Sequence, residues 1–182
     1  MRLFGEIMRV YVCASKAEAQ GFIEKFRLKK FEILLDEFRV SLWKNGEILL
    51  FVCGIKFGAN EIGAEILGEI LQNFGIKEAI NFGICGCDDD KISLGSAFSF
   101  EGNFSQNGVN LICVSEPQTT KIAQNGTNLY DMESAKFAEI CDKFGVSWKI
   151  YKIVSDHLID AKIDKAAAVS LVRAHAQKIG EL

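Results

Sequence analysis

The stretch KEAINFGICG, residues 77–86, decides the fold of this sequence. Residues 77–83 predict a strand because of the largely apolar AINF at 79–82, and the glycines at its end predict a tight turn over residues 83–86. An amphipathic helix is predicted just before it, over residues 60–74, where Ile and Leu recur at helical spacing until Gly75 ends the pattern. A helix that leads into a buried strand is typical of a sheet covered by helices.

The same alternation runs along the rest of the chain. Strands are predicted at residues 8–13, 38–43, 47–53, 96–104, 109–114 and 148–154, and further helices at 17–26, 131–144 and 166–178. Asn-Gly pairs at 45–46 and 107–108 predict hairpins, because both residues tolerate positive φ. Residues 115–128 show no strong periodicity. The fold class is therefore α/β, a three-layer sandwich with a mixed sheet flanked by helices, in one domain over residues 1–182.

The composition excludes several classes of protein. Of 182 residues, 49% are hydrophobic, which is too many for a disordered chain. A formal net charge of −3 gives no electrostatic footprint for nucleic acid. No run of about 18 apolar residues predicts a membrane span, and a charge falls early in the N-terminal stretch where a signal peptide is apolar. We therefore expect a cytoplasmic protein with no nucleic-acid or membrane partner.

The cysteines and histidines do not predict a metal centre. Most of the six cysteines lie inside apolar runs, which favours buried free thiols. The pair Cys85 and Cys87 is one residue too close for a zinc knuckle, and the two histidines, His157 and His175, lack ligand spacing.

Ligands of such sheets bind where strands end and loops begin. The predicted strand ends are residues 13–18, 53–58, 83–86 and 154–157, and residues 131–134 open a helix. Each has a plain structural alternative, because glycines permit turns and Asp131 can cap a helix through Ser134. Five such segments in one sheet predict a small-molecule pocket without naming its ligand.

Three of these segments resemble motifs of the nucleoside phosphorylase and nucleosidase superfamily. They are NFGICG at 81–86 with KISLGS at 91–96, DMESA at 131–135, and IVSD at 153–156. Their order and spacing match from about residue 9 to 159. The pattern is most similar to methylthioadenosine/adenosylhomocysteine and futalosine nucleosidases, which break an N-glycosidic bond. The resemblance implies a small-molecule nucleoside as ligand and a homodimer or higher homo-oligomer.

The resemblance also implies roles for individual residues. Asp156 is the expected general acid that protonates a leaving purine at N7, and Ser155 orients it. Glu133 is expected to accept hydrogen bonds from the ribose hydroxyls, with Met132 against the sugar.

Further roles fall on two other segments. Glu18 is expected to activate the attacking water, and the alternative is an exposed helix residue. The resemblance places four more residues against the substrate: Ser15, Gly83, Cys85 and Gly86.

Two other functions stay open at this point. Phosphorolysis, with phosphate as co-substrate and no other cofactor, is disfavoured because no arginine lies at a predicted strand end. The other hypothesis is a family member that binds a nucleoside without cleaving it. Two features suggest it: Ile84 stands where the family has a hydroxyl residue, and the chain is shortened between about residues 96 and 130. Phe98, Phe100 and Phe104 are candidates to stack on the base, although the core is their plainer location. The apolar face of helix 60–74 could likewise serve a subunit contact or pack on the sheet.

Overall fold

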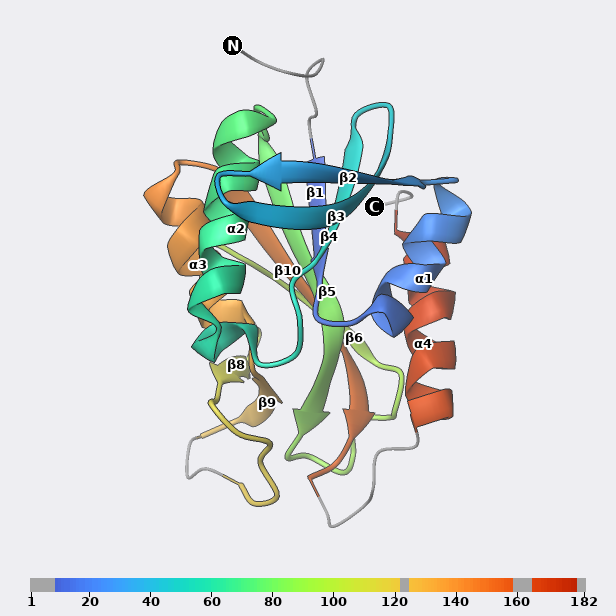
Figure 1. Ribbon diagram of the computed structural model, residues 1–182. Helices are drawn as coiled ribbons and strands as arrows, with labels where there is room; N and C mark the ends of the chain where they lie inside the picture. Colours follow the sequence, from blue (N-terminus) through green and yellow to red (C-terminus); the bar gives the residue numbers. More distant parts are fainter. Residues whose placement is uncertain (1–8, 122–124, 159–164, 180–182) are drawn as a thin grey trace.

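Strand β5 lies in the middle of the sheet in the computed structural model (Figure 1). The structure describes residues 9–121, 125–158 and 165–179. The strands are β1 Arg9–Cys13, β2 Lys29–Leu35, β3 Phe38–Asn45, β4 Ile48–Val52, β5 Glu78–Cys87, β6 Ala97–Glu101, β7 Ser105–Gln106, β8 Val109–Cys113, β9 Thr127–Asp131 and β10 Ser147–Asp156. The helices are α1 Lys16–Lys25, the short 3₁₀ turn Phe57–Ala59, α2 Glu61–Asn73, α3 Ser134–Lys143 and α4 Lys165–Lys178. None of the described helices is long and apolar enough to span a membrane.

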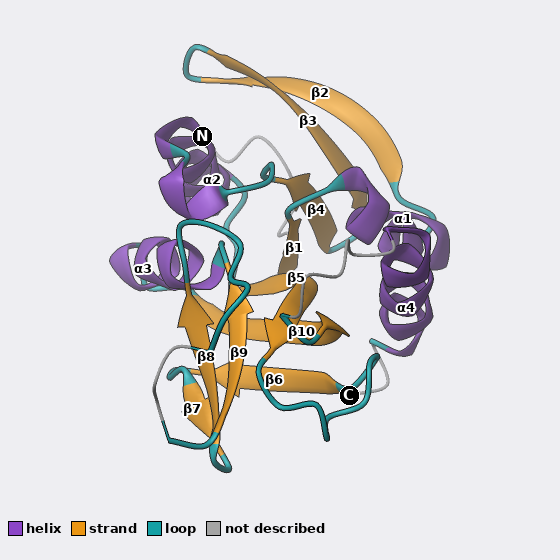
Figure 2. Cartoon of the chain, turned by 90° about the horizontal axis from the view of Figure 1, so that it is seen from below, coloured by secondary structure: helices purple, strands orange, loops and turns teal. Residues whose placement is uncertain are grey.

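The sheet is mixed and lies between two layers of helices. Helices α2 and α3 cover one face, and α1 and α4 cover the other (Figure 2). Each face has its own apolar core, so β5 alternates between the two: Ala79 and Cys85 pack toward α2 and α3, whereas Ile80 and Phe82 pack toward α1 and α4. The predicted three-layer α/β sandwich in a single domain is confirmed.

The sheet branches at β5. One edge of β5 pairs along its length with the parallel strand β10. Strand β1 pairs in parallel with β5 only as far as Asn81, and the antiparallel strand β9 pairs with it at Gly86 and Cys87. Residues 82–85 of β5 therefore face the opening where β1 has ended and β9 has not begun. This opening, at the carboxyl ends of β1, β4 and β5, is where ligands of open α/β sheets bind.

Both predicted Asn-Gly turns are confirmed, but the partner of β8 across the second turn is the short strand β7, whereas β6 pairs with β10. Asn107 and Gly108 have φ of 52° and 78° between β7 and β8, as a two-residue hairpin turn requires. Strands β3 and β4 also form an antiparallel pair next to Gly46, whose φ is 54°. Helix α2 buries Leu67, Ile70 and Leu71 in the core, so packing on the sheet is its main contact.

The prediction of a turn at residues 83–86 is wrong. Strand β5 runs through Gly83 to Cys87, because β10 stays hydrogen-bonded to it as far as Gly86. The glycines allow close approach of side chains instead of a change of direction.

Three strands escaped prediction, and the shortest of them, β7, has only two residues. Strand β2 carries exposed lysines and is an edge strand paired with β3. Strand β9 lies partly in the stretch without periodicity, and it takes Asp131, so that α3 begins at Ser134 and not at residue 131. Strand β9 is held by pairing with β8 and β5, which its own local pattern does not show.

Gly21 gives a test of the contact between α1 and α4. A Cβ at Gly21 would lie 2.6 Å from Cβ of Ala176 and 3.1 Å from Cα of Arg173, so α4 must move to admit it. We expect Gly21→Ala to lower the free energy of unfolding by about 1–3 kcal/mol in urea denaturation.

Gly68→Ala is the matched control in a second helix. Its Cβ would meet only the ring of Phe144, at 3.0 Å, and a ring can turn aside. The gain in helix propensity, up to about 1 kcal/mol, offsets that strain. Equal stability of the two variants would contradict the close α1–α4 contact.

Candidate active site

The candidate site is built from side chains that enter the opening beside β5. Glu18 comes from α1, Lys152 from β10, and Asp131 and Glu133 from the end of β9. Because β9 is antiparallel to β5, the chain beyond Asp131 runs back along β5 toward Gly83. This geometry brings residues distant in sequence to one point.

Glu18 is anchored by three hydrogen-bond donors. Ser15 caps helix α1, and its backbone N and Oγ donate to Oε2 of Glu18 at 2.8 and 3.0 Å. The backbone N of Ile84 donates to Oε1 at 3.2 Å across the opening in the sheet. Glu18 is only 8% exposed, so the alternative reading of an exposed helix residue is wrong.

Position 83 requires glycine because the carboxylate of Glu18 lies close to the backbone of β5 at this point. A Cβ at this position would lie 2.7 Å from Oε1 of Glu18 and 3.7 Å from Nζ of Lys152. The missing side chain leaves the space in which the carboxylate and the ammonium group face each other. The structure therefore brings together three residues predicted as site residues: Ser15, Glu18 and Gly83.

Lys152 is the residue that sequence reasoning missed. Its side chain is 1% exposed, and Nζ lies 2.7 Å from Oδ2 of Asp131 and 3.2 Å from Oε2 of Glu133. Burial alone would lower the pKa of Lys152, but the two carboxylates reverse that effect and raise it. The signal in the sequence is a lysine inside the apolar strand pattern of residues 148–154, because a buried lysine needs an acidic partner.

The two acidic partners of Lys152 have different second contacts. Asp131 accepts hydrogen bonds from the backbone N and the hydroxyl of Ser134, so the predicted capping contact exists as well. Burial raises the pKa of Glu133, and Lys152 only partly opposes this. Within the described part of the chain, Lys152 is the one hydrogen-bond donor to the Glu133 carboxylate, which leaves Oε1 for another donor.

Met132 is fixed through its backbone. Its carbonyl accepts a hydrogen bond from the backbone N of Gly58 at 2.9 Å, and a Cβ on Gly58 would lie 2.6 Å from that oxygen. The loop after β4 thereby rests on the segment that carries Glu133.

Asp156 lies farther along β5, beside Gly86. Its Oδ1 accepts from the backbone N of Leu158 at 3.1 Å and would lie 3.2 Å from a Cβ on Gly86. The hydroxyl of Ser155 lies 2.8 Å from Oδ2 of Asp156 and 3.2 Å from the carbonyl of Cys85. The Cys85 thiol itself is buried, and burial raises its pKa. Cys85 thus contributes its carbonyl to this group of residues.

The site has two centres on one strand. Glu18, Lys152 and Glu133 gather at Gly83, and Asp156 with Ser155 gathers at Gly86. Three residues of extended chain separate them by roughly 10 Å. The first centre holds the carboxylates of Glu18 and Glu133, and the second holds that of Asp156.

The phenylalanines of the middle region belong to the core. Phe100 is 1% exposed, Phe98 packs against the core, and Phe104 stacks on Trp148 with ring centroids 5.6 Å apart. The plainer location given for them above is confirmed.

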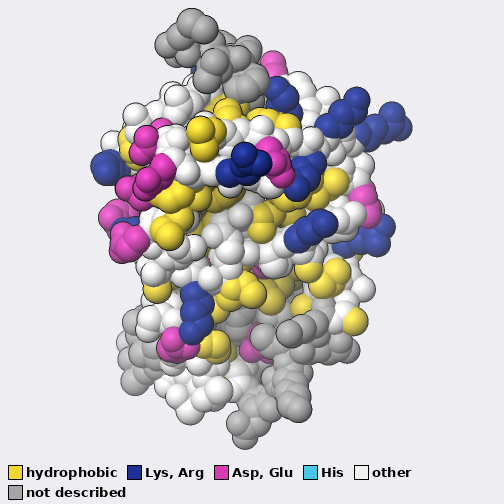
Figure 3. Space-filling model, in the orientation of Figure 1, with side chains coloured by type: hydrophobic (Ala, Val, Ile, Leu, Met, Phe, Trp, Pro, Cys, Tyr) yellow, Lys and Arg dark blue, Asp and Glu magenta, His cyan; other side chains and the backbone are white. Residues whose placement is uncertain are grey.

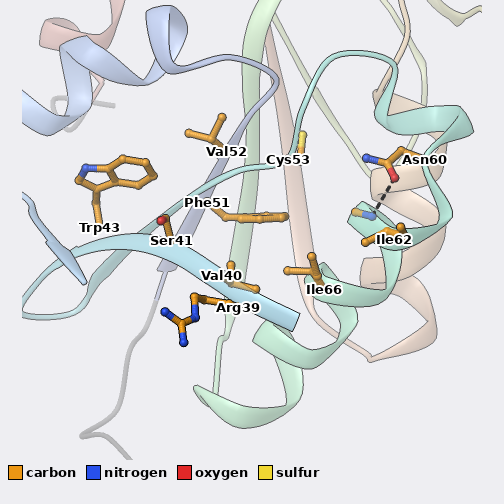
Figure 4. A pocket seen from close by; sticks show the side chains of 11 residues that line it. Arg39, Val40, Ser41, Trp43, Phe51, Val52, Cys53, Asn60, Ile62 and Ile66 are labelled. Atoms are coloured by element: carbon orange, nitrogen blue, oxygen red, sulfur yellow. Dashed lines mark hydrogen bonds between the residues drawn. The ribbon is translucent and has the colours of Figure 1, made fainter. Parts of the chain in front are cut away.

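Two surface hollows lie beside the site. One, of about 270 Å³, lies between β3, β4 and the start of α2 and reaches Cys53 (Figure 4). The other, of about 490 Å³, lies along β7 and β8 and reaches Ala135. Figure 3 shows apolar side chains at the surface on the face that carries the first hollow. Neither hollow is lined by Glu18, Glu133 or Asp156.

No group of three or more His, Cys, Asp or Glu side chains within residues 9–121, 125–158 and 165–179 could hold a metal ion.

The fold is that of known nucleosidases. The sequence matches no protein-family model and no curated protein. The structure of 5′-methylthioadenosine nucleosidase from Arabidopsis thaliana is similar, with a TM-score of 0.74 and 18% identity over 96% of this chain and 93% of that one. Futalosine hydrolase of Helicobacter pylori has a TM-score of 0.61 at 16% identity, over 97% and 99% of the two chains.

A third similar structure contains a bound ligand. The 5′-methylthioadenosine/S-adenosylhomocysteine nucleosidase of Neisseria meningitidis was solved with methylthio-immucillin-A, and it has a TM-score of 0.68 at 13% identity over 97% and 100% of the two chains. The resemblance inferred from the motifs is thus confirmed at the level of the fold.

Lys152→Met tests the buried ion cluster. The variant keeps much of the side-chain volume but leaves Asp131 and Glu133 buried without their cation. Removing one partner of a buried pair costs about 3–5 kcal/mol, which urea denaturation at pH 7.5 should detect. The control is Lys149→Met on the same strand, whose half-exposed ammonium pairs with exposed Glu101, and we expect it to cost less than about 1 kcal/mol.

The pH dependence of that variant has a defined sign. Glu133 already has a raised pKa, and loss of Lys152 raises it further. The folded protein then holds this proton at a pH where the unfolded chain has lost it, so stability falls as pH rises through the folded pKa. Lys152→Met should be less destabilised at pH 5 than at pH 7.5, and the opposite trend would contradict the cluster.

Proposed function

We propose that the protein hydrolyses the N-glycosidic bond of a purine nucleoside or of a 5′-substituted analogue. The observation that carries the proposal is the placement of two carboxylate centres roughly 10 Å apart along β5, at Gly83 and at Gly86. The fold shared with nucleosidases supports the same reaction class. A nucleoside that lies along β5 would have its sugar at the first centre and its base at the second.

Asp156 is the general acid of the proposed reaction. A purine anion is a poor leaving group, so a proton must reach the base as the bond stretches. The hydroxyl of Ser155 can donate to only one acceptor at a time. Its two possible acceptors are Oδ2 of Asp156 and the carbonyl of Cys85. Ser155 therefore orients the carboxyl group through Oδ2, and the proposed acid proton goes to the base.

Glu133 binds the sugar. Its Oε2 is held by Lys152, and Oε1 can accept hydrogen bonds from ribose hydroxyls. Met132 precedes it and is fixed against the loop that carries Gly58. A carboxylate next to the sugar also stabilises the positive charge that develops as the glycosidic bond breaks.

Glu18 is the proposed base for the attacking water. Its carboxylate stands at Gly83, at the same centre as Glu133, and electrostatic coupling to Glu18 raises the pKa of both Glu133 and Lys152. The side chain of Ile84 supplies no hydroxyl, and its backbone N instead donates to Glu18. The hydrogen bond that β5 donates to the proposed base therefore comes from a peptide group, and it does not depend on the side chain at position 84.

Charge favours hydrolysis over phosphorolysis. Three buried carboxylates, of Glu18, Asp131 and Glu133, surround the single ammonium group of Lys152. A phosphate dianion would enter a site that already has an excess of negative charge. The backbone N of Ile84, which could bind an anion, is occupied by Glu18. Water is therefore the proposed nucleophile, and the reaction needs no cofactor.

The proposal is tested by release of free base. The protein is incubated with adenosine, inosine, methylthioadenosine and futalosine, with and without phosphate, and the base is measured by chromatography. We expect base without phosphate, and Asp156→Asn should lower kcat by about 10²–10⁴-fold because the acid is lost.

Asp36→Asn is the control for that assay. It makes the same chemical change in the turn between β2 and β3, at an exposed residue with φ of 50° that asparagine tolerates. Full turnover by Asp156→Asn would contradict the acid role. Base released only with phosphate would favour phosphorolysis, and binding without release would leave a nucleoside-binding protein.

Glu18→Ala tests the base through chemical rescue. The variant loses the carboxylate but keeps three donors, the backbone N and hydroxyl of Ser15 and the backbone N of Ile84. We expect a fall in kcat of about 10²–10⁴-fold, partly restored by sodium formate, whose carboxylate fits the vacated position. Glu18→Gln is the control, because its amide fills that position and should not respond to formate. Wild-type turnover by Glu18→Ala would exclude Glu18 as the base.

A further inference from the structure

The orientation of Asp156 depends on the turn that follows it. Strand β10 changes register between Val154 and Asp156, and the chain then bends back over β5. Leu158 has φ of 63°, which is unfavourable for a leucine, and Cδ2 would lie 2.6 Å from a Cβ on Gly86. The backbone N of this strained residue is also a hydrogen-bond donor to Asp156. Displacement of the turn would therefore displace the carboxyl group.

His157 ties this turn to another part of the molecule. Its Nε2 lies 2.7 Å from the carbonyl oxygen of Ile92, in the segment between β5 and β6. A carbonyl only accepts, so Nε2 carries the proton and donates it. The bond joins residues 65 positions apart, and His157 lies between the two residues, Asp156 and Leu158, that define the position of the acid.

The segment that receives this bond is itself fixed. The backbone N of Ile92 donates to the carbonyl of Asp89 at 3.1 Å, and the backbone N of Gly95 donates to Val154 at 2.8 Å. The second bond reaches β10 just before its change of register. His157 reaches the same segment just after that change, so the irregular part of β10 is held on both sides.

We propose that His157 is a positioning residue for the acid Asp156, an inference that rests on the proposed hydrolysis. By donating to Ile92 it holds the strained turn against β5 and keeps the carboxyl of Asp156 directed at the base. The role needs only the donated hydrogen bond, so a neutral side chain with a donor at the same reach can replace the imidazole. Displacement of a reacting group by about 1 Å costs about 10²-fold in rate.

Three substitutions separate positioning from general stability. His157→Phe keeps the ring but removes the donor, and His157→Gln keeps a donor of comparable reach. His175→Phe is the matched control, because Nε2 of His175 lies 2.9 Å from the carbonyl of Gly95 in the same segment but comes from α4, away from Asp156. We expect kcat to fall about 10- to 100-fold in His157→Phe, with KM unchanged, and to return to within a few-fold of wild type in His157→Gln. His175→Phe should keep kcat within about twofold.

A double-mutant cycle shows whether His157 acts through Asp156. In the Asp156→Asn background, His157→Phe should change the remaining rate by less than about twofold, because the acid it positions is already gone. The same variant should hardly affect hydrolysis of 4-nitrophenyl β-D-ribofuranoside, whose leaving group needs no proton. Losses that multiply in the double variant, or wild-type kcat in His157→Phe, would overturn the proposal.

The outcomes also separate this inference from the proposed function. Absence of base release by the wild type overturns both. Turnover that is lost in Asp156→Asn but kept in His157→Phe overturns the role of His157 alone. If His157→Phe does not fold, as judged by circular dichroism, His157→Asn replaces it, since its shorter amide does not reach Ile92 but stays polar.

Discussion

The ammonium group of Lys152 is buried between two carboxylates, and the rest of the site depends on this contact. Without the cation, the buried carboxylates of Asp131 and Glu133 would be unpaired charges, and burial of an unpaired charge costs several kcal/mol. The ion cluster joins β10 to the end of β9 across β5. It thereby fixes the segment 131–133 that carries Glu133, the residue proposed to bind the sugar. Loss of this one cation would affect the fold and the site together.

The branching of the sheet creates the space for this cluster. In a regular sheet, β1 would pair with β5 along its whole length, and the backbone N of Ile84 would donate to a neighbouring strand. Here β1 pairs no farther than Asn81, and the side chain of Glu18 takes the place of a strand backbone. The carboxylate of Glu18 accepts the hydrogen bond that the carbonyl of a neighbouring strand would accept. The same contact therefore satisfies the backbone of β5 and positions Glu18, the proposed base.

Local patterns in the sequence predict β5 and β10, which carry part of the site, but not how they pair. The capping box at Ser15 and Glu18 is readable locally, although it does not show that Glu18 also reaches β5. The glycines at 83 and 86 were read as a turn because a local pattern cannot show the side chains that approach them. Strand β9 was missed because its stability comes from pairing with β8 and β5. The proposed acid, Asp156, follows from the family resemblance, whereas Lys152 requires knowledge of which face its strand presents.

The choice of lysine at position 152 follows from the space above Gly83. An ammonium group is a compact point charge on a flexible stem, whereas a guanidinium is a wider planar fork. Nζ of Lys152 already lies 3.7 Å from where a Cβ on Gly83 would be, and Oε1 of Glu18 lies 2.7 Å from the same point. A point charge serves both Asp131 and Glu133 from this confined position and leaves the second oxygen of Glu133 available. The single lysine thus neutralises only part of the cluster, which suits the proposed reaction, because there a cation develops on the sugar and no phosphate enters.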